Sequence, residues 1–156
     1  GVDQATGQVA MCAVSTYLHG DASRYFTTRF FRNLDPNVPD GGYDLGCANI
    51  DVKGSFMRYS KDPANYNLLM RPEEVQDDWV YIHCLIHHAN EDPKTWVDTP
   101  PTIYITGWAA SADLPDTPVA EGHLKGALKI PVPNLKPLPP IRYDWFHHGF
   151  VAREDR

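Results

Sequence analysis

Residues 79–88, WVYIHCLIHH, decide the fold class. β-Branched and aromatic residues dominate this stretch, and it is followed by a polar turn, ANEDP, that contains a proline. Both features predict a β-strand. Alternate side chains of a strand share one face, so one face would carry Trp79, Tyr81, His83, Leu85 and His87.

Outward from this strand, further stretches have the same β character and are separated by turns rich in Pro, Gly, Asn and Asp. The predicted strands cover residues 9–17, 25–31, 50–59, 102–109 and 124–130. The 14 prolines exclude long helices almost everywhere, and one short helix is expected at residues 71–78, with Pro72 in its first turn. The pattern predicts an all-β protein, an antiparallel β-sandwich or jelly-roll-like barrel with long loops.

Two regions follow from the proline distribution. Residues 1–130 are expected to form the β-sandwich domain, and residues 131–156 a proline-rich strap with an aromatic C-terminal arm. An exposed aromatic patch is costly, so we expect the arm to dock on its own domain or on a neighbour. Its assembly contacts would be made by Trp145, Phe146 and Phe150.

Composition restricts the class of protein. The chain has 156 residues and a net charge of −6, with its basic residues scattered, so we expect no strong nucleic-acid binding. It contains no long apolar run, so we expect no membrane span. Three widely spaced cysteines favour a reducing compartment. No signal peptide is visible, and Gly1 at the start would suit a processed chain, so we expect the protein in a virion or the cytoplasm.

Histidines of the 79–88 strand are the candidate metal ligands, namely His83, His87 and His88. On one strand, however, His83 and His87 would lie about 13 Å apart, because each residue adds about 3.3 Å. One ion could not bind both without help from another strand. We therefore expect no metal and no cofactor.

A hydrolase would need a nucleophile, a base and an orienting acid. The candidate catalytic residues of those types are Ser15, His19, Asp21 and Asp35. No GxSxG elbow accompanies them, so the sequence favours a non-enzymatic protein. The adjacent acids at residues 73–74 and 77–78 are interpreted as a solvated face or a helix start.

A binding module for carbohydrate or another small ligand is an alternative. Its stacking platforms would be Trp96, Tyr104 and Trp108. Tyr104 and Trp108 have the same strand parity, so one face could present both rings.

Residues 79–122 combine a strand, WVYIHCLIHH, a polar turn, ANEDPKTWVDTPP, a second strand, TIYITGWAAS, and an acidic exit, ADLPDTPVAEG. This order resembles the last strands of jelly-roll coat or protruding domains of picorna-like virus capsid proteins. The resemblance implies a structural protein of the virion that assembles with copies of itself or with other capsid chains. The chain lacks a basic arm for packaging RNA, which favours a surface or protruding domain.

Overall fold

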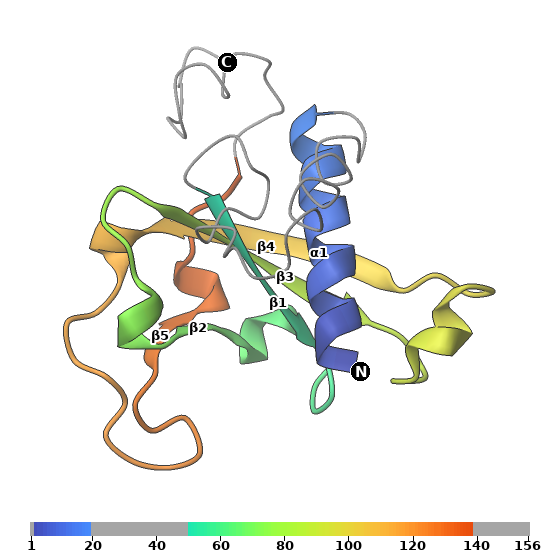
Figure 1. Ribbon diagram of the computed structural model, residues 1–156. Coiled ribbons are helices and arrows are strands. Elements are labelled where there is room, and N and C mark those ends of the chain that lie inside the picture. Colours follow the sequence, from blue (N-terminus) through green and yellow to red (C-terminus); the bar gives the residue numbers. More distant parts are fainter. Residues whose placement is uncertain (1, 20–49, 139–156) are drawn as a thin grey trace, which may run out of the picture.

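The computed structural model describes residues 2–19 and 50–138, and these form three layers (Figure 1). The middle layer is a sheet of β1 (Ile50–Phe56), β3 (Val80–His87) and β4 (Thr102–Ala110). Helix α1 (Val2–His19) packs on one face of this sheet. A two-stranded sheet of β2 (Asn67–Met70) and β5 (Leu128–Pro131) covers the other face.

Strand β3 lies between β1 and β4 and is buried on both faces. Its Ile82, Cys84 and Ile86 belong to the core under α1, whereas Tyr81 belongs to the core under β2 and β5. A strand covered on both faces needs apolar residues at nearly every position. This explains why residues 79–88 are apolar or aromatic almost throughout. The strands predicted around β1, β3 and β4 are confirmed, and β5 is shorter than predicted.

Strand pairing differs from the expected pattern in one respect. β3 pairs antiparallel with β4, and β2 pairs antiparallel with β5, but β1 runs parallel to β3. The expectation of a purely antiparallel sheet is therefore wrong. A parallel pair needs a crossover connection, and here the chain makes it through β2, a strand that we did not predict. Across residues 50–138 the two sheets do not close into a barrel.

Residues 9–17, predicted as a strand, lie instead within the 18-residue helix α1. Among the α1 residues whose side chains the structure describes, Thr6, Ala10 and Val14 are buried, and they are spaced four apart. This spacing places the three residues on one face of a helix. The strand prediction relied on the apolar character of residues 9–17 and did not use this spacing. Over residues 2–19 and 50–138, the all-β expectation is thus corrected to a β-rich fold with one α-helix.

Short 3₁₀ turns connect the strands: η1 (Pro63–Asn65), η2 (Pro72–Glu74), η3 (Pro93–Trp96), η4 (Ser111–Asp113) and η5 (Val132–Asn134). Proline suits the first positions of such turns because its missing N–H would have no partner there. The helix expected at residues 71–78 is the single turn η2. The strand predicted at residues 25–31 lies outside the described residues.

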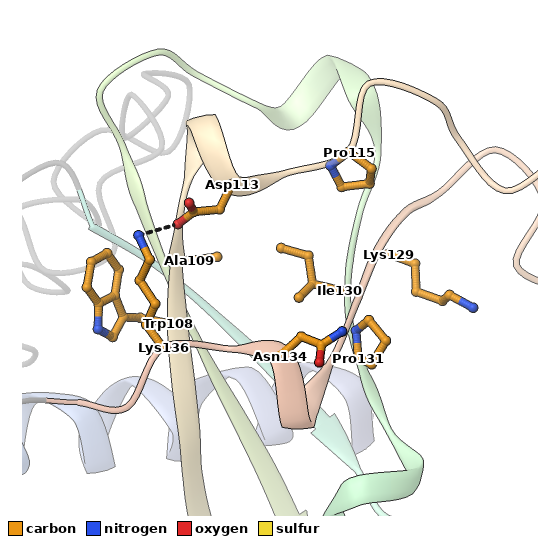
Figure 2. Close-up of a pocket in the computed structure, with 9 residues that line it drawn as sticks. All are labelled: Trp108, Ala109, Asp113, Pro115, Lys129, Ile130, Pro131, Asn134 and Lys136. Carbon is orange, nitrogen blue, oxygen red and sulfur yellow. Dashed lines mark ion pairs between the residues drawn. The ribbon is translucent and has the colours of Figure 1, made fainter.

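Residues 135–138, the last described part of the proline-rich strap, return to β4. Trp108 and Lys136 exchange two backbone hydrogen bonds of 2.9 Å, and the Trp108 indole N–H donates to Pro137 at 3.1 Å. Figure 2 shows Lys136 directed toward Asp113, and their charged groups lie 2.8 Å apart. Burial raises the pKa of Asp113, but hydrogen bonds from Lys136 and from the Ala110 N–H outweigh it and lower that pKa.

A bulge interrupts the pairing of β3 with β4. His83 pairs with Gly107 and Cys84 with Ile105, so Thr106 is an extra residue on β4. An extra residue reverses the parity of the side chains beyond it. Consequently Tyr104 is 41% exposed and Trp108 only 7%, and the two rings do not share an exposed face.

Candidate functional site

A charged cluster lies at the β1 edge of the three-stranded sheet. The Lys53 ammonium is 3.1 Å from the Asp51 carboxylate and 3.6 Å from the Glu74 carboxylate. All three side chains are partly buried, with exposed fractions of 27%, 20% and 36% for Lys53, Asp51 and Glu74. Two carboxylates from separate elements therefore meet at one ammonium group.

Local structure explains how these side chains meet. Asp51 and Lys53 are two residues apart on β1 and so project from the same face. Glu74 ends η2 and accepts a 3.1 Å hydrogen bond from the Arg71 N–H, which orients its carboxylate. The segment after η2 is tied to the sheet by Tyr81, whose hydroxyl accepts a 2.8 Å hydrogen bond from the Gln76 N–H. Burial raises the pKa of Tyr81, which keeps this hydroxyl neutral.

His83 stands beside Lys53 on the same face, because the two residues are register partners in the parallel pair. Its Nδ1 is 2.6 Å from the Thr106 hydroxyl. Its Nε2 is buried and has no hydrogen-bond partner. The side chain is 1% exposed, and burial lowers the pKa of His83 to about 4, so the imidazole is neutral near pH 7.

The cluster contains two carboxylates, which are possible ligands for a divalent cation. Mg²⁺ is commonly bound by one or two carboxylates and keeps several waters or substrate oxygens. Asp51 and Glu74 supply two such carboxylates, and Lys53 neutralises them without a cation. An ammonium at the same place can also stabilise an oxyanion of a bound substrate.

The histidines predicted as metal candidates have separate surroundings. His87 is the last residue of β3 and is half-buried. His88 begins the following loop and is hydrogen-bonded to residues of that loop. The His88 Nδ1 accepts from the Asn90 N–H at 2.9 Å, and its Nε2 donates to the Thr99 carbonyl at 2.7 Å. Both ring nitrogens are thus occupied. In residues 2–19 and 50–138, no three His, Cys, Asp or Glu side chains converge as a metal site.

The predicted catalytic set is only partly described. Ser15 and His19 both belong to α1, four residues apart, rather than to a strand end and turn. Asp21 and Asp35 lie outside the described residues, as do the predicted assembly residues Trp145, Phe146 and Phe150. A role for these residues stays a prediction.

The aromatic residues proposed for ligand stacking are mostly internal. Trp96 is 7% exposed, its ring stacks on Phe56 with centroids 5.9 Å apart, and its indole N–H donates to the Asn90 carbonyl at 2.9 Å. Trp108 is equally buried under the strap, which leaves Tyr104 as the exposed ring of the three. Glycan binding stays a prediction, and these residues do not form a common platform for it.

The charged cluster was missed because its parts are far apart in the sequence. Asp51 and Lys53 lie in a predicted strand, and Glu74 belongs to an acidic pair interpreted from the sequence as a solvated face or a helix start. The spacing of one acid and one lysine, two apart within a predicted strand, was the local signal. That spacing does not indicate that Glu74 joins the cluster, because Glu74 lies more than twenty residues further along the chain.

Comparisons with models of protein families, with curated proteins and with solved structures found no match to the chain. In the described part of the chain, no helix combines the length and apolarity needed to cross a membrane.

Proposed function

We propose that this protein is a divalent-cation-dependent hydrolase of phosphodiesters. Asp51 and Glu74 would bind the cation, and Lys53 would stabilise the charge of the phosphate. The observation that supports this function is the Lys53 ammonium held between two carboxylates from β1 and η2.

Stability alone gives a weak reason for this cluster. Partly exposed ion pairs contribute roughly 0–1 kcal/mol, and two neighbouring carboxylates repel each other. Apolar β-branched residues would stabilise a half-buried strand face better. The convergence of Asp51 and Glu74 is therefore better explained by a ligand that needs both.

Charge balance indicates the class of substrate. One ammonium, one divalent cation and two carboxylates together leave a single positive charge. A phosphodiester carries one negative charge and would neutralise it, whereas a phosphomonoester carries close to two near pH 7. The cluster thus favours a diester.

The proposed reaction is the hydrolysis of one phosphorus–oxygen bond by water. Water oxygen forms a new bond to phosphorus as the bond from phosphorus to the leaving oxygen breaks. The water gives up a proton to solvent, and the leaving oxygen takes one up. Lys53 would donate hydrogen bonds to the phosphate oxygens as charge develops on them. A bound cation would supply further charge neutralisation and acidify water.

Calorimetric titration with Mg²⁺ and hydrolysis of bis(p-nitrophenyl) phosphate, with and without chelator, test this proposal on the full chain. We expect one Mg²⁺ per chain and chelator-sensitive hydrolysis. Asp51→Asn and Glu74→Gln should each weaken Mg²⁺ binding by roughly tenfold or more, as loss of a charged ligand does. Lys53→Met should retain binding and lower kcat by about 10²-fold or more.

Asp113→Asn is the matched control, because Asp113 forms a comparable ion pair with Lys136 at the β4 edge (Figure 2). It should change neither Mg²⁺ binding nor hydrolysis. Absence of Mg²⁺ binding at millimolar concentrations would reject the proposal. Full hydrolysis by the Asp51→Asn, Glu74→Gln double variant would reject it as well.

Assembly, the function expected from the sequence, is a second proposal. An apolar groove between α1 and the segment after η3 supports it, with Val9, Cys12, Trp96, Val97 and Ile103 among its lining residues. Val97 is 84% exposed there, which favours contact with a second copy of the chain. A β-sandwich or jelly-roll-like architecture and a place in a virion or the cytoplasm belong to this proposal.

Light scattering on a sizing column tests assembly. An oligomer that Val97→Asp dissociates, and that the neighbouring Asp98→Asn leaves intact, would support it. A monomer at high micromolar concentration would reject it.

A further inference from the structure

The outer edge of β4 is open over the first half of the strand. β4 is an edge strand of the three-stranded sheet, and on its outer side the described chain forms one bridge, between Trp108 and the strap residue Lys136. Between Thr102 and Thr106 no described residue bonds to the backbone on this side. An exposed strand edge with free N–H and C=O groups is a ready site for pairing with another strand.

The direction of the backbone identifies the free groups. The Ile86 carbonyl accepts a 2.8 Å hydrogen bond from the residue that follows β1, so the backbone groups of Ile86 face that strand. Backbone groups alternate in direction along a strand, so those of Leu85 face β4, and those of its partner Tyr104 face β3. The residues on either side of Tyr104, which are Ile103 and Ile105, therefore direct their N–H and C=O groups outward.

This edge is complementary to a second copy of itself. A two-fold axis through Tyr104 would set two β4 strands antiparallel, with Ile103 of one copy opposite Ile105 of the other. Residues paired in this way exchange both of their backbone hydrogen bonds, so every outward N–H would meet a C=O. β4 has no charged side chain, so no like charges would oppose each other across the contact.

Features at both ends restrict the pairing to one short stretch. Residues 100–101, both proline, precede the strand and have no N–H to donate to a neighbouring strand. At the other end, the bulge at Thr106 interrupts the strand, and the bridge from the strap occupies the edge at Trp108. The open edge is therefore centred on Tyr104, which is the position of the two-fold axis.

We infer that two copies of the chain pair their β4 strands antiparallel about Tyr104, which joins two three-stranded sheets into one continuous sheet. This inference rests on the second proposed function, assembly, and names the surface and the geometry of the contact. The exposed Val97 lines the same apolar groove as Ile103, so a copy paired at this edge lies beside Val97. On the opposite face the two Tyr104 side chains, each 41% exposed, meet at the closely spaced position of the antiparallel pair.

Cross-linking of the full chain tests the register, in a background where Cys12 and Cys47 are replaced by serine and the buried Cys84 is retained. Tyr104→Cys should give a disulfide-linked dimer on air oxidation, because the Cα atoms of the two copies of residue 104 would lie about 4.5 Å apart. Thr102→Cys is the matched control on the same exposed face. Its two copies would be offset by four residues, or about 13 Å, and should form no such dimer on a non-reducing gel.

A charge at the axis tests the contact in the original background. Tyr104→Lys should raise the dissociation constant of the oligomer at least about tenfold, because two ammonium groups would face each other across the axis. Tyr59→Lys is the matched control, since Tyr59 is 92% exposed and lies outside β4. It should leave the dissociation constant unchanged in light scattering over a dilution series.

The results separate this inference from assembly itself. An oligomer that cross-links through Thr102→Cys and not through Tyr104→Cys would overturn the pairing about Tyr104 and leave assembly standing. An oligomer that Tyr104→Lys leaves intact would do the same. A monomer at high micromolar concentration would reject assembly and this inference together, and would leave the edge of β4 to a strand from another protein.

Discussion

Gly54 of β1 lies so close beneath α1 that a Cβ atom at this position would be 2.9 Å from the Cβ of Ala10. It would also lie 3.3 Å from the Thr6 carbonyl oxygen. The helix can therefore approach the sheet edge only because residue 54 has no side chain. This contact fixes α1 over the strand that carries Asp51 and Lys53.

Gly54→Ala should lower the free energy of unfolding by about 1–3 kcal/mol, because the added methyl group forces α1 away from β1. Urea denaturation followed by circular dichroism measures this change. Gly7→Ala is the control, since Gly7 lies in α1 with nothing within 4 Å of a Cβ atom. It should stabilise the protein by about 0.5–1 kcal/mol. Equal effects of the two substitutions would contradict the close approach.

Gly107→Ala should detach the strap from β4. Gly107 has φ +150°, and a Cβ atom there would lie 2.7 Å from the Lys136 carbonyl oxygen. We expect a loss of stability of about 2 kcal/mol or more, with altered Trp108 fluorescence. Gly122→Ala has positive φ but open space, so only backbone strain of about 1 kcal/mol should appear. If the fluorescence of Gly107→Ala is unchanged, the strap does not depend on this glycine.

His83 should make stability depend on pH. Its pKa is about 4 in the folded protein and 6.5 in an unfolded chain. Between these pH values the imidazole of His83 is protonated in the unfolded chain and neutral in the folded protein. The free energy of unfolding therefore has its full value above pH 6.5 and decreases as the pH falls toward 4. The loss should reach about 3 kcal/mol. Urea denaturation at pH 7 and pH 4.5 should show a steeper decrease for the original chain than for His83→Leu. Parallel decreases would contradict the buried neutral imidazole.

Thr106→Val should remove the acceptor of the His83 Nδ1–H without changing the shape of the side chain. We expect a loss of about 1–3 kcal/mol, the cost of an unsatisfied buried donor. Thr106→Ser retains the hydroxyl and should cost less. Thr102→Val on the exposed end of β4 should stay within about 0.5 kcal/mol in thermal or urea unfolding. A Thr106→Val variant as stable as the original would show that the pair contributes nothing.

Predictions from local sequence were accurate where one segment carries its own signal. The apolar run at residues 79–88 predicted β3, and prolines indicated the turns that contain η1 and η3. Residues 9–17 were assigned wrongly because a short apolar run suits a buried strand and a buried helix alike. The four-residue spacing of Thr6, Ala10 and Val14 becomes informative only when the sheet that covers them is known.

The sequence by itself determined a β-rich chain and the position of its central strand, because these depend on neighbouring residues. Only the tertiary structure decided that β1 runs parallel to β3, that a bulge at Thr106 separates Tyr104 from Trp108, and that Glu74 meets Asp51 and Lys53. Those features depend on which distant segments pair and in what register. Register is set by the packing of the whole core, which no single stretch of sequence contains.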